Sequence, residues 1–142
     1  VTSIMASFNV SILLETPPKM LKLQPISNHV YLKINILRGM MYCGILWGLY
    51  NTEQQGWAMT SDHDDYVFPF WLNGLHAHQY AQLHWPNYIP KKITPQDFQS
   101  ALLPTLSRLK VTPALCNGTR RMKLSTSQMR HFFFNDAILE PA

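Results

Sequence analysis

The stretch WGLYNTEQQGWAMTSDHDDYVFPFW, from Trp47 to Trp71, decides the fold of this chain. Together with the two residues before it, the stretch holds three short apolar runs, ILWGLY, GWAMT and YVFPFW, which are separated by the polar segments NTEQQ and SDHDD. Short apolar runs bounded by turn-forming residues are typical of consecutive strands. The stretch therefore predicts a three-stranded antiparallel meander.

Both faces of this meander are apolar. Successive side chains of a strand point to opposite faces, so Trp47 and Leu49 share one face while Leu46 and Tyr50 share the other. We expect helices over one face, and the N-terminal segment or a partner over the other.

Pro69 lies within the third run and cannot donate a hydrogen bond to a strand ladder. We therefore expect residues 66–71 to form an edge strand or to carry a bulge. The free backbone groups of an edge strand can pair with a second chain, which makes a homodimer possible.

Apolar spacing and capping residues predict two helices next to the meander. Residues 27–41, SNHVYLKINILRGMM, carry apolar side chains along one helical face, and Ser27 or Asn28 can cap that helix. Residues 75–85, LHAHQYAQLHW, show the same spacing over a shorter length and end before Pro86.

The C-terminal half contains further start and stop signals. After a loop at residues 86–92, Thr94 can cap a helix that has proline at its first position, and Pro104 should kink or split this helix. The Asn117-Gly118 pair is a strong signal for a β-hairpin turn.

Ser125 and Gln128 form a capping box ahead of a terminal helix of about twelve residues. Successive strands are connected too briefly for parallel crossovers. The order predicts a single α+β domain over residues 25–142, in which a small antiparallel sheet, made of the meander and a C-terminal hairpin, packs with three to four helices. Residues 1–24 are expected to be an irregular N-terminal extension with one strand at residues 7–14.

The composition excludes several classes of protein. With 142 residues, 46% hydrophobic and 14% charged, the chain is long enough for one core and too apolar for disorder. A net charge of +4 is too small and too dispersed for a nucleic-acid footprint, so nucleic acid is an unlikely partner. The longest apolar run, residues 36–50, is too short to span a membrane and contains Arg38.

Cys43 and Cys116 are the two cysteines. They lack the spacing of a metal or redox motif and fit buried, reduced thiols of a cytoplasmic protein, with a native bridge in the core as the alternative. No secretory signal is visible, because no basic region precedes the apolar start of the chain. We therefore expect a cytoplasmic location.

Several rare residues recur in an order that is typical of a known family. They are Trp47-Gly48-Leu49-Tyr50, Gly56-Trp57-Ala58, Phe68-Pro69-Phe70-Trp71, Tyr80-Ala81, Trp85 with Tyr88 and Pro90, Ile93, Phe98 and Leu103-Pro104-x-Leu106. In this order they resemble the bacterial domain-of-unknown-function family 2750 over about residues 25–142. The resemblance implies a small, cytoplasmic bacterial protein, and it implies no activity, cofactor or catalytic residue. Histidine and glutamine here replace the family's acidic residues after the third strand.

The aromatic residues of the meander have two interpretations. They can form a pocket wall or an interface, because aromatic side chains contribute much of the energy of binding. They can also simply fill the core of a small sheet. We expect most of them in the core, and we expect Trp71 and Trp85 to be exposed because they lie at element ends beside loops.

The histidines and carboxylates give no metal signature. His76, His78 and His84 lack the spacing of a zinc motif, and we interpret them as surface residues. The SDHDD loop, residues 61–65, has three carboxylates that suit calcium, but it lacks the rest of an EF-hand and is predicted to be a solvated turn. No nucleophile motif and no glycine-rich phosphate loop is present, so the sequence predicts no metal, no cofactor and no catalytic residue.

The basic residues of the C-terminal part suggest a further surface. Arg120, Arg121, Lys123 and Arg130, with Arg108 and Lys110 nearby, are the candidates for one basic face. Such a face would contact phosphates or an acidic partner. The alternative is scattered charge that keeps the protein soluble.

The leading functional hypothesis is a non-enzymatic bacterial protein-interaction module of the immunity or adaptor type, which binds an acidic partner surface. The candidate partner-binding residues are Trp71, Trp85, Phe70, His76 and His78. A small-molecule-binding protein or weak enzyme, with an aromatic pocket between the sheet and the helix at residues 75–85, is the alternative. Nucleic-acid binding through the basic face ranks third. A concave pocket with convergent polar groups would favour the second hypothesis over the first.

Overall fold

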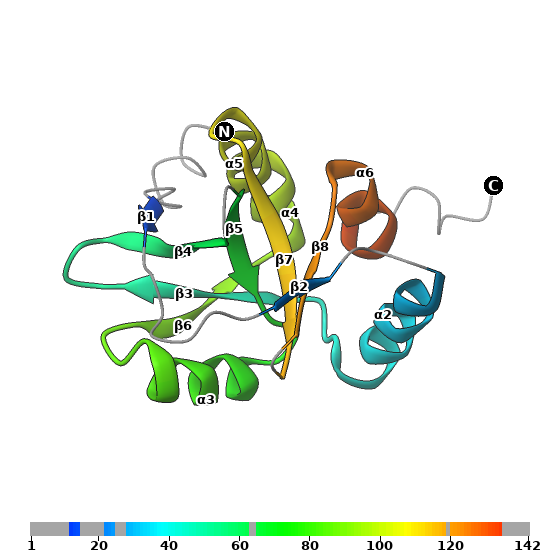
Figure 1. Ribbon diagram of the computed structural model, residues 1–142, viewed down its shortest axis with the longest axis horizontal. Coiled ribbons are helices and arrows are strands. Elements are labelled where there is room, and N and C mark those ends of the chain that lie inside the picture. Colours follow the sequence, from blue (N-terminus) through cyan, green and yellow to red (C-terminus); the bar gives the residue numbers. More distant parts are fainter. Residues whose placement is uncertain (1–11, 15–21, 25–27, 63–64, 119, 135–142) are drawn as a thin grey trace.

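Eight strands of the described chain form one mixed sheet. The computed structural model describes residues 12–14, 22–24, 28–62, 65–118 and 120–134. The strands are β1 (Ile12–Leu14), β2 (Lys22–Gln24), β3 (Leu46–Asn51), β4 (Gly56–Asp62), β5 (Asp65–Phe70), β6 (Ile89–Ile93), β7 (Val111–Asn117) and β8 (Arg120–Lys123). Their order across the sheet is β2-β8-β7-β5-β4-β3-β6, and β1 pairs with β4 (Figure 1).

Four helical segments pack around this sheet in the described residues. They are α2 (Asn28–Met41), α3 (Gly74–His84), the run of α4 (Pro95–Asp97), η1 (Phe98–Leu102) and α5 (Leu103–Arg108), and the run of α6 (Thr126–Met129) and η2 (Arg130–Phe134). None of the helices in the described ranges is long and apolar enough to cross a membrane. The α+β class is therefore confirmed.

The predicted meander and hairpin are both present. Strands β3, β4 and β5 pair antiparallel in succession, with Tyr50 opposite Trp57 and Thr60 opposite Val67. Strands β7 and β8 pair antiparallel up to Asn117 opposite Arg120, and Gly118, which directly follows Asn117, has a φ of 63°. Glycine adopts this left-handed conformation at little cost, which explains why the sequence signal was reliable.

The prediction of a small, purely antiparallel sheet is wrong. Strand β5 pairs with β7 in parallel, β1 pairs with β4 in parallel, and β2 pairs with β8 in parallel. The connection from β5 to β7 runs through α3, β6 and α4 to α5, which is long enough for a crossover. The prediction considered only the short connections between strands that are consecutive in the sequence, and it did not consider pairing between β5 and β7.

Strand β5 is consequently an interior strand, and the predicted edge at residues 66–71 is wrong. It lies between β4 and β7, so its backbone is not free to pair with a second copy of the chain. Pro69 is tolerated because β5 pairs with β4 only at residues 65–67. Beyond that point Trp71 bridges to Trp47 of β3, so the missing N–H of Pro69 falls between two pairings.

The segment predicted to be a loop at residues 86–92 contains a strand. Strand β6 pairs antiparallel with the whole length of β3, from Leu46 opposite Ile93 to Tyr50 opposite Ile89. Its sequence, IPKKI, has a proline and two lysines, residues with low β-propensity that are common on edge strands. The low β-propensity of these residues therefore predicted a loop, whereas pairing with β3 makes the segment a strand.

The helix boundaries follow the predicted caps. Thr94 Oγ1 accepts a hydrogen bond from Asp97 N at 3.0 Å, and Pro95 occupies the first turn. The π-helical turn η1 directly precedes Leu103-Pro104, which is the predicted interruption. The capping box of Ser125 with Gln128 is also present.

The two faces of the sheet bury different cores. The larger cluster, which includes Trp57, Phe68, Phe70, Phe98 and Leu102, lies under η1, α5 and η2. The smaller cluster lies under α3 and consists of Leu49, Ala58, Trp71, Ala77, Tyr80, Ala81, Trp85, Tyr88 and Cys116. In Figure 1 α3 lies on one side of the sheet, and α4 and α5 lie on the other. We call the side that carries the larger cluster, under η1, α5 and η2, the aromatic face. We call the side that carries the smaller cluster, under α3, the α3 face.

Candidate functional site

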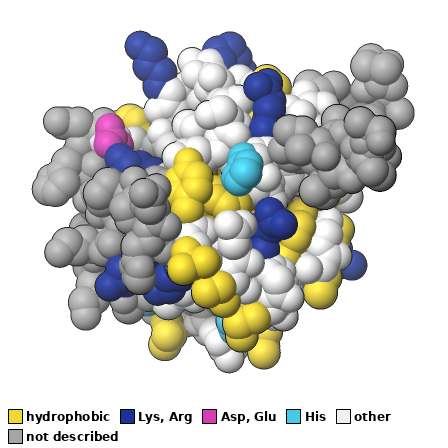
Figure 2. Space-filling model, turned by 90° about the vertical axis from the view of Figure 1, so that its right-hand side faces the viewer, with side chains coloured by type: hydrophobic (Ala, Val, Ile, Leu, Met, Phe, Trp, Pro, Cys, Tyr) yellow, Lys and Arg dark blue, Asp and Glu magenta, His cyan; other side chains and the backbone are white. Residues whose placement is uncertain are grey.

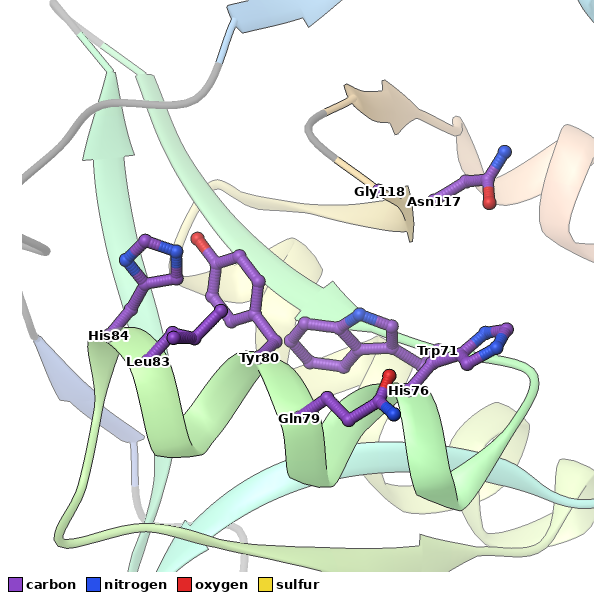
Figure 3. A pocket seen from close by; sticks show the side chains of 8 residues that line it. All are labelled: Trp71, His76, Gln79, Tyr80, Leu83, His84, Asn117 and Gly118. Carbon is purple, nitrogen blue, oxygen red and sulfur yellow. The ribbon is translucent and has the colours of Figure 1, made fainter.

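A pocket of about 450 Å³ lies between α3 and the turn of the β7–β8 hairpin (Figure 3). Eight residues line it: Trp71, His76, Gln79, Tyr80, Leu83, His84, Asn117 and Gly118. Five of them come from α3 at positions 76, 79, 80, 83 and 84. This spacing of three and four residues places them on one face of the helix.

The position of α3 depends on its N-terminus. Asn73 Oδ1 accepts hydrogen bonds from the backbone N–H groups of Leu75 at 2.8 Å and His76 at 3.2 Å. Gly74 allows close contact with the sheet, because a Cβ atom there would lie 2.9 Å from the Trp47 ring. The helix therefore begins at a fixed point against β3, and its pocket-facing side follows from that point.

Aromatic side chains form the inner wall of the pocket. The Trp71 and Tyr80 ring centroids are 5.3 Å apart, and the Tyr80 and His84 centroids are 4.5 Å apart. Trp71 is held by a pair of backbone hydrogen bonds with Trp47, of 2.9 and 2.8 Å. The wall is therefore anchored to β3 and to α3, and is not part of a loop.

Arg121 lies behind this wall and is completely buried. It is the backbone partner of Cys116 in the β7–β8 ladder, so both side chains point to the α3 face. Its Nη2 atom donates a hydrogen bond to Tyr80 Oη at 3.2 Å. Its Nε and Nη1 atoms have no hydrogen-bond partner in the part of the chain that the structure describes.

The groups around Arg121 do not neutralise it. Burial raises the pKa of the Cys116 thiol to about 12, although the Arg121 charge acts in the opposite direction. Burial likewise raises the pKa of Tyr80, against the hydrogen bond and the charge of Arg121. Both groups are therefore neutral at neutral pH, and neither supplies a negative charge to balance the Arg121 guanidinium.

The predicted exposure of the aromatic residues is wrong. Trp71 and Trp85 are each only 3% exposed, and Phe70 is fully buried in the core of the aromatic face. Their positions at element ends did not expose them, because α3 folds back over Trp71 and its C-terminal end brings Trp85 into the same cluster. Trp71 contributes to the pocket wall, whereas Trp85 and Phe70 do not line it.

Of the three histidines predicted to lie at the surface, two are exposed and the third is half-buried. His76 and His78 are both exposed, but only His76 lines the pocket. His84, which is half-buried, joins it because it lies eight residues further along α3. The sequence contained this signal, since residues 76, 80 and 84 repeat at intervals of four.

The four candidate residues for a basic face do not share one surface. Arg121 is buried under α3, and Lys123 pairs with Asp65 at 2.9 Å. Arg120 and Arg130 are exposed, on β8 and η2. On the side of the molecule shown in Figure 2, Lys and Arg side chains lie apart from one another. A strand turns Arg120 and Arg121 to opposite faces, which favours the alternative of scattered charge.

No metal site is formed by the described residues, among which no three His, Cys, Asp or Glu side chains come together. His63 and Asp64 of the SDHDD segment lie outside the described residues. Both cysteines are free, and Cys43 is exposed, contrary to the expectation of two buried thiols.

Comparison with known proteins identifies the family. The chain matches no curated protein and no solved structure. A family model described as a protein of unknown function, DUF2750, matches residues 35–127. This range holds most of the tryptophan and proline motifs and both the pocket-lining helix and Arg121. The chain therefore belongs to the DUF2750 family, as the order of its motifs predicted.

Proposed function

We propose that this protein binds a small molecule in the pocket between α3 and the β7–β8 hairpin. The observation that supports this function best is the combination of an aromatic wall with polar residues in the lining of one hollow. Trp71 and Tyr80 form the wall, Gln79 and His84 line the pocket from α3, and Asn117 lines it from the hairpin (Figure 3). Sites for small ligands combine apolar walls with a few placed polar groups in this way.

The size of the pocket supports the same function. About 450 Å³ lies within the range of roughly 300 to 1,000 Å³ that is usual for small-molecule sites. A molecule with one or two rings fits this volume, and it can contact the parts of Trp71 and Tyr80 that line the pocket. The burial of Trp71, Trp85 and Phe70 speaks against the exposed aromatic rim of the interaction hypothesis.

Filling the pocket with a side chain tests this function. Gln79 is exposed and lines the pocket, whereas Gln82 is exposed on the same helix and does not line it. We expect ligand-detected NMR with a library of one- and two-ring compounds to yield ligands for the wild type. Gln79→Trp should weaken their binding by about tenfold or more, and Gln82→Trp should leave it unchanged. Ligands that bind all three proteins equally, or no ligand at about 1 mM, would contradict the proposal.

Protein–protein interaction is a second candidate, favoured by a different surface. Leu32, Ile36 and Met40 repeat at intervals of four on α2 and are 59%, 51% and 75% exposed. Figure 2 shows a band of hydrophobic side chains on the side of the molecule where α2 and α6 lie. An exposed apolar stripe on a helix suits the groove of a partner protein.

A charge placed in the centre of the apolar stripe of Leu32, Ile36 and Met40 tests whether this surface binds a protein partner. Ile36→Lys should abolish capture of a protein partner, and Asn35→Lys, at the neighbouring exposed position, should not. Sizing of the purified chain distinguishes a partner from a second copy, because only self-association depends on the concentration of the chain itself. Capture that survives Ile36→Lys would rule out this surface.

A further inference from the structure

The buried guanidinium of Arg121 indicates which chemical class of ligand the pocket takes. This inference rests on the proposed function, because it concerns the same pocket. We propose that the ligand carries an anionic group, a carboxylate or a phosphate monoester, and that this group binds at the Tyr80 hydroxyl with Arg121 directly behind it. The aromatic wall then holds the remainder of the ligand.

The first argument is the incomplete hydrogen bonding of Arg121. A guanidinium has five N–H donors and stays charged at every accessible pH. Here the side chain is fully buried, and only Nη2 has a partner among the described residues. A buried charge without a counter-charge is strongly destabilising, so a protein retains one where an anion compensates it.

The second argument is the direction in which the unbalanced charge acts. Arg121 contacts Tyr80, and Tyr80 lines the pocket, so one hydrogen bond of 3.2 Å joins the guanidinium to the pocket wall. The Tyr80 oxygen accepts from Arg121, which leaves its own O–H free to donate into the pocket. A charge-assisted hydrogen bond of this kind binds an anion more strongly than a neutral group.

The third argument is the absence of competing negative charge at the pocket. None of its eight lining residues is acidic, and two of them are histidines. Within the described strands β5 and β8, Asp65 is the one acidic residue. It already pairs with Lys123. The local charge therefore favours a ligand of the opposite sign.

The experiment compares matched probes on the full chain. Benzoate and phenyl phosphate carry the two anionic groups on a single ring, and benzamide is the neutral counterpart of benzoate. By calorimetric titration we expect at least one anion to bind about tenfold or more tightly than benzamide. The anion that binds more tightly distinguishes a carboxylate site from a phosphate site.

Three variants assign the preference to Arg121. Arg121→Met should remove the difference between benzoate and benzamide, and Tyr80→Phe, which keeps the ring, should reduce it by several-fold. Arg120→Met changes the neighbouring exposed arginine of the same strand and should leave the preference intact. If Arg121→Met does not fold, the several-fold reduction of the preference in Tyr80→Phe still tests the inference.

The outcomes separate this inference from the proposed function. Equal binding of benzoate and benzamide to the wild type would overturn the anion preference while leaving a small-molecule pocket in place. An anion preference that persists in both Tyr80→Phe and Arg121→Met would also overturn it, because the charge would then come from elsewhere. Anion binding that Gln79→Trp leaves unchanged would instead contradict the pocket as the binding site.

Discussion

The aromatic face and the α3 face of the sheet are built from the same strands but differ in what they bury. On the aromatic face, rings pack edge to face on one another, with the Phe98 centroid 6.0 Å from Phe68 and 5.6 Å from Phe70. On the α3 face lie the described buried side-chain atoms without a partner: Thr60 Oγ1, Trp85 Nε1, and Nε and Nη1 of Arg121.

This difference separates stability from function within one small domain. A close-packed aromatic core stabilises the fold, and none of the unpartnered buried atoms found in the described residues belongs to it. Buried polar groups without partners cost free energy, and proteins retain such costs mainly at functional sites. The contrast predicts that removal of a ring from the aromatic face and removal of the buried charge from the α3 face will change stability in opposite directions.

The largest loss of stability is expected on the aromatic face. Phe98→Ala removes a fully buried ring that contacts Phe68 and Phe70, and it leaves a cavity. The free energy of unfolding should fall by about 3–5 kcal/mol in denaturant titration. Leu83→Ala on the α3 face is the control, since Leu83 is 77% exposed and its truncation should cost less than about 0.5 kcal/mol. A similar loss in both variants would contradict the contrast.

The opposite sign is expected for Arg121→Met. Methionine fills much of the same volume without a charge, so the cost of burying the guanidinium disappears while Tyr80 loses one donor. The free energy of unfolding of the ligand-free protein should rise by about 1–4 kcal/mol at neutral pH. Arg120→Met, which changes an exposed arginine of the same strand, should not raise it in this way. Lower stability of Arg121→Met would show that the guanidinium already has a stabilising partner.

A methyl group added to a glycine compares the packing of the two faces. In Gly48→Ala the new Cβ would lie 2.9 Å from the ring of Trp57, which is fully buried, and the loss should be about 1–3 kcal/mol. In Gly74→Ala it meets the half-buried Trp47 ring at the same distance, which can shift more easily, so the loss should be smaller. Thermal unfolding measures both.

Gly39 supplies the control for this pair. A Cβ there meets nothing within 4 Å, and Gly39 lies inside α2. Gly39→Ala should therefore stabilise the protein by roughly 0.5–1 kcal/mol, because alanine is the better helix former. A greater loss for Gly74→Ala than for Gly48→Ala would reverse the conclusion about the two faces.

The smallest effect concerns the buried thiol of the α3 face. The pKa of Cys116 is raised from 9.0 to about 12 in the folded chain, so the folded state holds this proton more tightly than the unfolded state. The resulting stability is fully present below pH 9 and is lost as the pH rises toward about 12. At about pH 10 the wild type should have lost roughly 1 kcal/mol more than Cys116→Ala, relative to neutral pH.

Denaturant titration at the two pH values measures this difference. Cys43→Ala removes the exposed thiol and keeps the buried one, so it should retain the pH dependence of the wild type. An identical pH dependence for the wild type and Cys116→Ala would show that the buried thiol does not contribute.

Much of the local structure was predictable because its signals are short-range. The Asn117-Gly118 turn, the Thr94 cap and the capping box at Ser125 each depend on residues within a few positions of one another. The meander was predictable for the same reason, since its strands are joined by brief connections. The interruption before Pro104 also follows from one residue's missing N–H.

The candidate site was predictable only in part. The helix at residues 75–85 and the aromatic pocket beside it were among the hypotheses, and His76 was among the candidate residues. Arg121 was assigned to a surface, because alternation along RRMK gives the face of a side chain but not what covers that face. Its burial depends on α3, which lies about 40 residues earlier in the chain.

The sequence by itself determined the α+β class, the family, the turns, the caps and the composition of the strands, because these depend on neighbouring residues and on the repeat of side-chain direction. Only the tertiary structure decided that β5 is interior, that IPKKI becomes a strand, and that Trp71, Tyr80 and Arg121 meet. The physical reason is that burial and pairing depend on segments far apart in the chain, whose approach no local propensity records.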